Sequence, residues 1–448
     1  MRSSPHPITR RDLDRLAIPA IISGIAEPLI ALVDVAYAGR LGTADLAAVG
    51  IGSSFFLLVV WVLAQTRSAV LAVVARYYGE QRLSEVSGLV PLAVWMNFAL
   101  GLLFFAITNA FSTQIFQLYN AHGEVLDKTV AYFHIRSFGY PFVLATFALT
   151  GAFRGMQNLR WSMWISVFGA VVNLALNPLL IFGYGGFPRL GIEGSSWASL
   201  VAQVSMFVFA IVVLKTRTPF PLFPKTWRHP ELASLWFLSG NLFVRTIALN
   251  ACYYLGARYA AGYRVLHSAA HSVAMNIWLF SAFFIDGYAA AGSVLVGRFN
   301  GEKNWKALYR VSWQVVRRSI LIGAILAALY GICYPWIGGL FTKGPETLAL
   351  FNAVFWLVII TQPINAVAFA FDGIYKGVGD GKSLRNVLII STFGVFLPVA
   401  WAMDSMGLQL HAVWTAFLLW MFTRGLMLSL AFEREFGPRS ALRRATPA

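Results

Sequence analysis

The stretch "PFVLATFALTGAFRG" (Pro141 to Gly155) recurs 222 residues later as "PINAVAFAFDGIYKG" (Pro363 to Gly377). The two copies share their first Pro, a Phe-Ala pair, an internal Gly and the final Gly. At the same offset "AVLAVVARYYGE" (Ala69 to Glu80) meets "AGSVLVGRFNGE" (Ala291 to Glu302), and both end in Arg-x-x-Gly-Glu. Two separated matches at one offset, with no net gap between them, indicate that the chain contains an internal duplication.

The composition places the chain in a membrane. Of its 448 residues 58% are hydrophobic and only 12% are charged, and the mean hydropathy is +0.66, whereas a soluble domain has about 25% charged residues. Apolar segments long enough to cross a hydrocarbon core of about 30 Å recur along the whole sequence. We predict twelve spans, at residues 13–39, 46–75, 87–111, 127–154, 161–183, 191–215, 231–256, 265–297, 308–333, 348–376, 384–404 and 408–433.

The duplication sets the architecture that we expect. Each half holds six spans, and because six is an even number, both halves enter the membrane in the same orientation. We therefore predict an all-α membrane protein with twelve transmembrane helices in two parallel six-helix lobes around a central cavity, as in several transporters. The expected lobes are residues 1–214 and 232–433, joined by a polar linker, 215–231, and followed by a basic tail, 434–448. Channels and enzymes also use duplicated folds, so this architecture favours transport without proving it.

The net charge of +16 follows this topology. Most of the 35 Lys and Arg residues lie in the two tails and in loops on the same side, a positive-inside pattern that puts both termini in the cytoplasm. The distribution argues against nucleic acid as a partner. Four acidic residues and the lack of a small-residue cleavage site in the first apolar segment argue against a removable signal peptide.

Two acidic residues of the first span need an explanation. Glu27 and Asp34 lie on one helix face in a segment otherwise suited to hydrocarbon, where a carboxylate costs about 2.5 kcal/mol or more. Desolvation at Asp34 disfavours the charged form, so this residue can exchange protons near physiological pH. The alternative is a structural Asp that accepts hydrogen bonds from another helix. Glu27, beside the helix-bending Pro28, is a candidate for a substrate or ion site, or for a pair with an arginine such as Arg67.

A second polar group lies in the fifth span, "VVNLALNPLL" (171–180). Asn173 and Asn177 are four residues apart, so both amides project from one face, and Pro178 weakens the helix beside them. Amides in lipid need partners, and a protonatable Asp on a facing helix would suit. The alternative is that they only hold helices together.

The second lobe has acids of its own. Asp286 and Asp372 each precede a glycine, and neither has an acidic counterpart at the 222-residue offset. They are candidates for a second cation, proton or substrate site, or for ion pairs with Arg245 or Arg424. Tyr37, in the first span, is a further candidate for lining the cavity.

Missing motifs narrow the function. The sequence has no G-x-x-x-x-G-K-[ST] segment to hold ATP, no H-E-x-x-H zinc motif and no TVGYG filter. Cys252 and Cys333 both lie in predicted spans and indicate neither a disulfide framework nor a metal site. We therefore expect a secondary transporter rather than an enzyme, with no metal and no cofactor other than the coupling ion.

With these features together, the sequence resembles the multidrug and toxic compound extrusion (MATE) family from about residue 12 to residue 432. The resemblance rests on "PLIALVDVAYAGRLGTADLAAVGIG" (28–52), "NLALNP" (173–178), "IDGYA" (285–289) and "FDGIYKG" (371–377), which look like the DinF branch. It implies that Asp34 is a proton-coupling residue with Asn173 and Asn177 as partners. The NorM-like branch pairs an acid of the seventh helix with one of the tenth. The seventh span here has Arg245 and no acid, which favours H⁺ over Na⁺ as the coupling ion.

We thus interpret the chain as a monomeric multi-pass antiporter of the bacterial inner membrane that works by alternating access in lipid. It would export amphipathic cationic organic compounds in exchange for protons, with Pro28 and Pro178 as hinges. A flippase of lipid-linked sugars, or an exporter of organic anions such as citrate, is the alternative, because Arg67, Arg136, Arg245 and Arg424 could line a cationic cavity. An intramembrane enzyme is a remote alternative, because the acids are scattered over both lobes.

Overall fold

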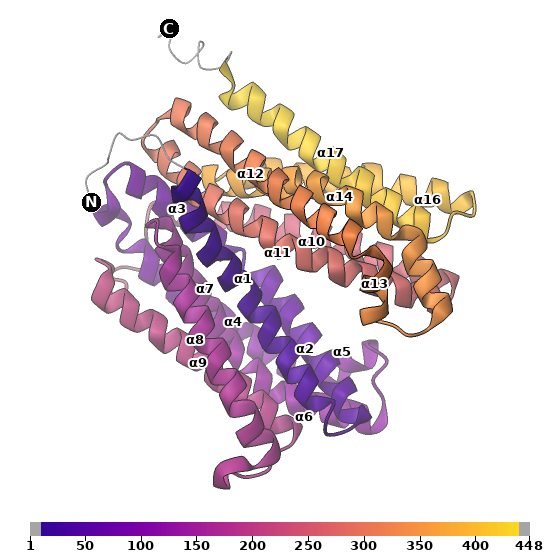
Figure 1. Cartoon of the computed structure of the whole chain (residues 1–448). Helices are drawn as coiled ribbons and strands as arrows, with labels where there is room; N and C mark the ends of the chain where they lie inside the picture. Colours follow the sequence, from indigo (N-terminus) through magenta and orange to yellow (C-terminus); the bar gives the residue numbers. More distant parts are fainter. Residues whose placement is uncertain (1–9, 439–448) are drawn as a thin grey trace. The chain divides into compact units, whose positions relative to one another are not determined.

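The computed structural model describes residues 10–438, apart from the side chains of Arg10 and Glu27, and within that range the chain forms helices and loops without strands (Figure 1). The helices of the first half are α1 (Arg10–Ala38), α2 (Thr43–Leu63), α3 (Thr66–Gly79), α4 (Leu89–Ala110), α5 (Ser112–Leu118), α6 (Gly123–Ser137), α7 (Gly139–Gly155), α8 (Leu159–Phe182) and α9 (Ile192–Arg217). Those of the second half are α10 (Leu232–Tyr263), α11 (Val265–Gly301), α12 (Trp305–Ile332), α13 (Tyr334–Ile337), α14 (Pro345–Val378), α15 (Gly381–Ser391), α16 (Leu397–Ser405) and α17 (Leu410–Phe436).

These helices account for the predicted spans. Eleven stretches of the described chain are long and apolar enough to cross a membrane, and each coincides with one predicted span. The remaining predicted span, 127–154, is formed by two shorter helices. These are α6 with 15 residues and α7 with 17, separated at Phe138. The predicted span 46–75 is likewise divided into α2 and α3.

Contacts divide the chain into two compact units. Unit 2 comprises Ile22–Trp236, and unit 1 comprises Phe237 onwards together with the residues up to Ile21. The division therefore falls inside α1 and α10 rather than in the polar segment 215–231. The start of α1 belongs to unit 1 because it packs on α11, where Asp14 accepts a hydrogen bond of 3.0 Å from the Tyr288 hydroxyl.

The duplication is visible in how closely helices approach one another within each unit. Three glycines of unit 2 lie against a neighbouring helix so closely that an added Cβ would come within 3.0 Å of it, and the glycines 222 positions later repeat these approaches in unit 1. The pairs in unit 2 are Gly101 with Pro141, Gly151 with Arg67, and Gly155 with Leu71, and those in unit 1 are Gly323 with Pro363, Gly373 with Ala289, and Gly377 with Ser293. Every partner also shifts by 222, so both units share one packing scheme.

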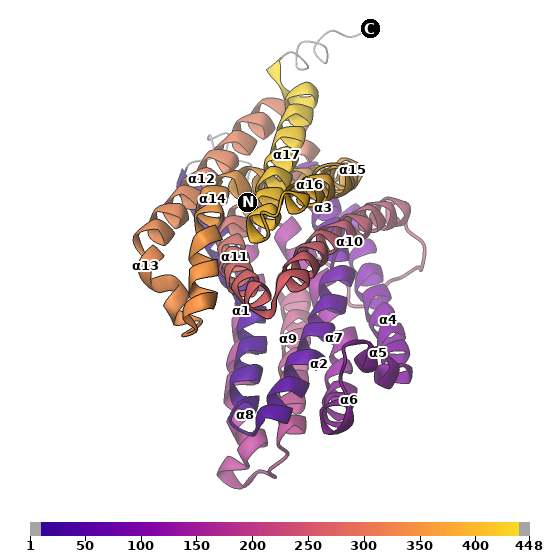
Figure 2. The ribbon, with the colours of Figure 1, turned by 90° about the vertical axis from the view of Figure 1, so that its right-hand side faces the viewer.

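Each unit has its own apolar core. In unit 2 the rings of Phe56 and Tyr140 stack with centroids 4.6 Å apart, in a cluster shared by α2, α5, α6 and α7. In unit 1 α14 packs against α11, α12 and α17 (Figure 2), and the fully buried Trp278, Trp414 and Trp420 fill the space around them. Buried aromatic rings contribute the largest apolar areas to such cores.

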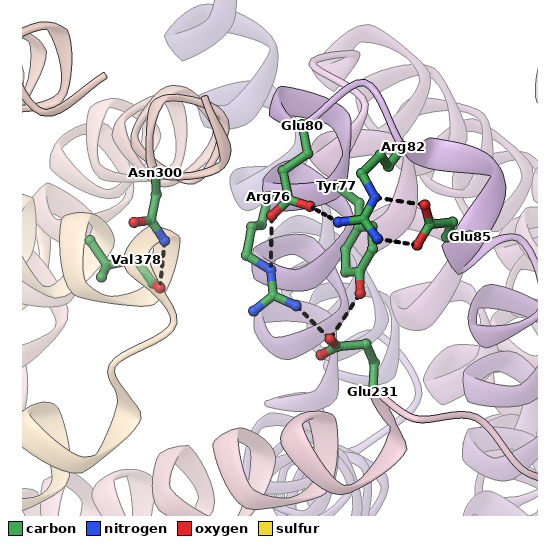
Figure 3. Close-up of polar contacts among 8 residues, drawn as sticks. All are labelled: Arg76, Tyr77, Glu80, Arg82, Glu85, Glu231, Asn300 and Val378. Carbon is green, nitrogen blue, oxygen red and sulfur yellow. Dashed lines mark hydrogen bonds and ion pairs between the residues drawn. The ribbon is translucent and has the colours of Figure 1, made fainter. Parts of the chain in front are cut away.

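The segment that follows α9 is held to unit 2 instead of lying free. Glu231 accepts from Arg76 at 2.8 Å and from the Tyr77 hydroxyl at 2.9 Å, so the start of α10 is bound to the end of α3 (Figure 3). The Trp95 indole donates to the Leu222 carbonyl at 3.0 Å. The polar residues of the segment 215–231, which predicted a linker, thus belong to a segment that hydrogen-bonds to unit 2.

We predict that Gly373→Ala lowers the thermal unfolding midpoint of the purified protein. The new Cβ would lie 2.3 Å from the Ala289 carbonyl oxygen, and overpacking of this kind costs about 1–3 kcal/mol. Intrinsic tryptophan fluorescence in detergent gives the midpoint. The control is Gly240→Ala, in α10 of the same unit, where no atom lies within 4 Å of the added carbon. Equal midpoints for the two variants would contradict the close approach.

Candidate proton-coupling site

The Asp34 carboxylate is fully buried and held by side chains from two other helices. It is 0% exposed. Its Oδ1 accepts from the amides of Asn173 at 3.2 Å and Asn177 at 3.0 Å, and its Oδ2 accepts from the Ser199 hydroxyl at 2.6 Å. The amides are themselves joined, because Asn177 donates to the Asn173 oxygen at 3.0 Å. We call these four residues the Asp34 network.

Helix geometry brings the Asp34 network together. The spacing of four residues on α8 puts both amides on one face, and they reach the carboxylate of α1 as a pair. Ser199 comes from α9, which packs beside α8. Asn173 also donates to the Ser199 oxygen at 3.0 Å, so the donors orient one another as well as the carboxylate. A buried polar group keeps its stability only when such partners are present.

Among the described side chains, no Lys or Arg nitrogen comes within 4.0 Å of the Asp34 oxygens. The charge that acts on Asp34 most is that of Arg136, on α6. Arg136 is 3% exposed, and its Nε and Nη1 have no hydrogen-bond partner among the described residues. Its guanidinium lies over the Phe56 ring, 4.2 Å from the centroid, which offsets part of the cost of burial.

A small, partly open cavity lies inside unit 2, lined by residues one helical turn from the network. Its walls are apolar residues of α1, α2, α7 and α9, with Arg136, Thr146 and Gln203 as the polar lining. Ile30 lines it one helical turn before Asp34, and Gln203 lines it one turn after Ser199, so lining residues and network residues lie on consecutive turns of α1 and of α9. An apolar cavity with a few polar groups is the usual form of a site for small organic molecules.

Among the described side chains, no other candidate on α1 or α8 hydrogen-bonds to the Asp34 carboxylate. Tyr37 packs its ring against that of Phe182, with 6.1 Å between the centroids. Pro28 and Pro178 both lie inside continuous helices, so hinge motion at either stays a prediction. The side chain of Glu27 lies outside the described residues, and its pairing with Arg67 stays a prediction.

In unit 1, Asp372 lies among cations. Its Oδ2 is 2.6 Å from Arg245 Nη2 and 2.7 Å from Lys376 Nζ, and its Oδ1 is 3.7 Å from Arg424 Nη2. Of the two interpretations of Asp372, the geometry favours ion pairing with Arg245 over a cation site. Asp286 is exposed and, within residues 10–438, receives no side-chain hydrogen bond, although the charges of Lys376 and Asp372 act on it.

Two residues of the site were not among the candidates chosen from the sequence. Ser199 belongs to a polar row on α9 with Ser196 and Gln203, at spacings of three and four residues in an apolar span, and that row was a detectable signal. Arg136 was considered only as one of four intramembrane arginines. Nothing in the sequence indicated that its charge acts on Asp34, because the two are about a hundred residues apart.

The comparisons with known proteins identify the family. The sequence matches the MatE family over residues 19–179 and 243–402, two segments that fall one in each half of the duplication. The chain therefore belongs to the MatE family, whose members are multidrug and toxic compound extrusion transporters. It is a multi-span membrane protein of that transporter class.

Relatives match over nearly the whole chain. "Protein DETOXIFICATION 45, chloroplastic" of Arabidopsis thaliana is 26% identical over 95% of this chain and 78% of its own length. "DNA damage-inducible protein F" of Escherichia coli (strain K12) is 23% identical over 94% of this chain and 91% of its own length. "Probable multidrug resistance protein NorM" of Agrobacterium fabrum is 24% identical over 93% of this chain and 92% of its own length. The DinF and NorM relatives have similar identities, so these matches show the family without singling out the DinF-like branch.

Solved structures confirm the fold. "Crystal structure of MATE in the bent conformation" matches with a TM-score of 0.90 at 19% identity, over 97% of this chain and 96% of that one. An outward-facing multidrug resistance MATE family transporter matches with a TM-score of 0.87 at 18% identity, again over 97% and 96%. The predicted all-α class with twelve helices in two lobes is thereby confirmed, and the predicted central cavity stays a prediction.

We predict that Ser199→Ala destabilises the protein more at pH 8 than at pH 5. The hydroxyl donates to the carboxylate, and loss of such a donor costs about 1–3 kcal/mol when the carboxylate is charged. If Asp34 takes up a proton between pH 8 and pH 5, the neutral carboxyl depends less on this donor, and the loss of stability at pH 5 is smaller. The thermal midpoint measured across this range shows the difference.

The matched control is Ser196→Ala, one turn earlier on α9, whose hydroxyl donates to the Tyr132 carbonyl at 2.9 Å and touches no carboxylate. Its effect is expected to be independent of pH. A Ser199→Ala effect that persists unchanged in an Asp34→Asn background would show that the hydroxyl acts elsewhere.

Proposed function

We propose that the protein is a proton-coupled antiporter that exports amphipathic, cationic organic compounds by alternating access. The observation that carries this proposal is the fully buried Asp34 carboxylate, held by neutral donors and without an ion-pair partner among the described residues, one helical turn from an apolar cavity. A carboxylate whose partners are all neutral can bind a proton without breaking a salt bridge.

The Asp34 network accommodates both protonation states. When the carboxylate is charged, Ser199 and the two amides donate to it. When Oδ2 takes a proton, it can donate to the Ser199 oxygen, because a hydroxyl is both donor and acceptor and rotates to suit. The amides keep their bonds to Oδ1. Protonation therefore changes the charge of the site with little movement of its atoms.

The sign of the coupling follows from Arg136. With Asp34 charged, the two charges offset one another, and a cation in the cavity meets little net repulsion. Protonation of Asp34 leaves Arg136 uncompensated, so a cation binds more weakly. Proton and cation then oppose each other, and by linkage the effect is reciprocal, which is what an exchanger requires. An anion in the same cavity would bind with the proton rather than against it.

The energy available is sufficient for export. The membrane potential supplies about 2.3 kcal/mol per charge per 100 mV, and a pH gradient adds about 1.4 kcal/mol per unit. In the proposed cycle a proton from outside displaces the cation, α1 bends at Pro28, and the proton leaves on the cytoplasmic side. The setting is the bacterial inner membrane, with both termini cytoplasmic and the protein acting as a monomer in lipid.

Asp34→Asn is expected to abolish proton-driven export of ethidium from proteoliposomes. Asn keeps the size and hydrogen-bonding capacity of the side chain but takes up no proton between pH 6 and 8. Dye movement and proton counterflow under an imposed pH gradient are measured together. Asp45→Asn, on α2 of the same unit and paired with Lys128 at 2.9 Å, serves as the control and should transport normally.

If Asp34→Asn still couples fully while Asp372→Asn does not, the ion site belongs to unit 1 and Asp34 is not the coupling residue. If neither variant loses coupling, protons are not the driving ion through either carboxylate. A Na⁺ gradient in place of the proton gradient then tests the other coupling ion.

Export of organic anions is a second candidate because of three buried arginines. Two of them, Arg245 and Arg424, lie at Asp372 in unit 1, and the third, Arg136, lines the cavity of unit 2. Arg136→Gln separates the candidates. For a cationic substrate the loss of the repelling charge lowers KM by about threefold to tenfold, an effect of roughly 1 kcal/mol. For an anionic substrate KM rises instead. Initial rates with ethidium and with fluorescein, at fixed pH gradient, distinguish the two.

A further inference from the structure

Cations outnumber anions in the interior of unit 1. We call Arg245, Asp372, Lys376 and Arg424 the Asp372 cluster, in which three cationic side chains surround one carboxylate. Asp372 is 3% exposed and Arg424 is 0% exposed. The cations remain in excess even when the exposed Asp286 of α11 is counted as an anion. Buried charges are stable only when they are paired, and among the described residues Asp372 is the one carboxylate that pairs with these three cations.

The arginines of the cluster also have unused donors. Within residues 10–438, Arg424 Nε and Nη2 and Arg245 Nε are buried without a hydrogen-bond partner. The Arg424 Nη1 contact is with the Met421 sulfur at 3.1 Å, a weak acceptor, and its guanidinium lies 4.7 Å from the Trp420 ring centroid. Guanidinium groups pair best with carboxylate and phosphate oxygens.

The duplication shows which of these charges the shared scaffold needs. At the 222-residue offset Lys376 corresponds to Arg154, and Arg245 corresponds to Ser23. In unit 2 the Arg154 guanidinium donates to the Ser23 hydroxyl at 3.1 Å, and Ser23 stands where unit 1 has Arg245. The extra arginine and the carboxylate of unit 1 are additions to that scheme, which points to a role beyond folding.

Access to the cluster runs through Lys376. Its side chain is 23% exposed, whereas those of its three partners are nearly or fully buried. Asp372 already has Arg245 at 2.6 Å, so the Lys376 charge is not needed to neutralise it. Lysine is a point charge on a flexible stem and can turn toward another anion. Asp286, also exposed, is the charged group on α11 that competes for it.

We propose that the Asp372 cluster binds the anionic head group of an amphipathic molecule, a carboxylate or a phosphate. Lys376 meets the head group, and Arg245 and Arg424 supply the positive field behind it. The same chemistry belongs to an exported organic anion and to a membrane phospholipid. This goes beyond the proton exchange proposed for Asp34, which uses residues of unit 2 alone, and it gives the second candidate function a location.

The test is equilibrium binding of tritiated decanoate to the full chain in nanodiscs of phosphatidylcholine, with partitioning into empty discs subtracted. Lys376→Gln is expected to weaken binding about tenfold. Asp286→Asn is expected to tighten it about threefold, because a competing anion is removed. Arg154→Gln, at the matched position of the duplication, leaves it unchanged. No ion gradient is present, so the result does not depend on proton coupling at Asp34.

Opposite shifts for the two unit 1 variants establish the site, since a general loss of structure cannot tighten binding. Decyltrimethylammonium should not displace decanoate. If phosphatidylglycerol displaces decanoate from the wild type but not from Lys376→Gln, the natural occupant is a phospholipid. If phosphatidylglycerol does not displace decanoate from the wild type, the occupant is an exported anion. Equal binding in all variants, or displacement by the ammonium compound, overturns the proposal. If Lys376→Gln does not fold, the Asp286→Asn variant alone still tests the proposal, because tighter decanoate binding is expected when the exposed competing anion is removed.

Discussion

The charge of a single carboxylate inside an apolar helix bundle is the constraint on which unit 2 depends. Asp34 is tolerated there only because α8 and α9 deliver three donors to it within 3.2 Å. Those donors require α1, α8 and α9 to keep their register, since a shift of one residue would turn each side chain by about 100° around its helix. The site is therefore both a cost to stability and the reason for a well-defined arrangement of three helices, a cost that function explains better than folding does.

The duplication separates the scaffold from what was added to it. Both units keep the same glycine approaches, at positions where any side chain would push two helices apart. Their buried charges differ. Unit 2 has a carboxylate among neutral donors and one arginine nearby, whereas unit 1 has a carboxylate enclosed by cations. One packing scheme thus supports two different surroundings for a buried carboxylate, neutral donors in unit 2 and cations in unit 1.

How much could be predicted from the sequence depended on the range of the interaction. The spans, the duplication and the facing amides of α8 follow from hydropathy, offset and a spacing of four, all of which are patterns visible along the chain, so they were predictable. The position of Asp34 against α8 was suggested by chemistry and by the family resemblance. Contacts between distant segments were not accessible: the charge of Arg136 acting on Asp34 and the placement of Arg245 against Asp372 depend on helix rotation and packing. The pair of Asp372 with Lys376, four residues apart on α14, is by contrast a local spacing that the sequence does show. The open choice for Asp372 between a cation site and a pair with Arg245 needed a distance to decide it.

The boundary between the units has a consequence for how the protein unfolds. It lies inside α1, after Ile21, and inside α10, after Trp236, so two hydrogen-bonded helices each contribute turns to both units. A flexible linker would let one half melt while the other persists. Here, loss of either half strips the packing from part of a helix whose remaining turns belong to the other half, and short helical remnants are marginal on their own. The two halves are therefore coupled in unfolding through shared backbone, and denaturation is expected to be a single cooperative transition.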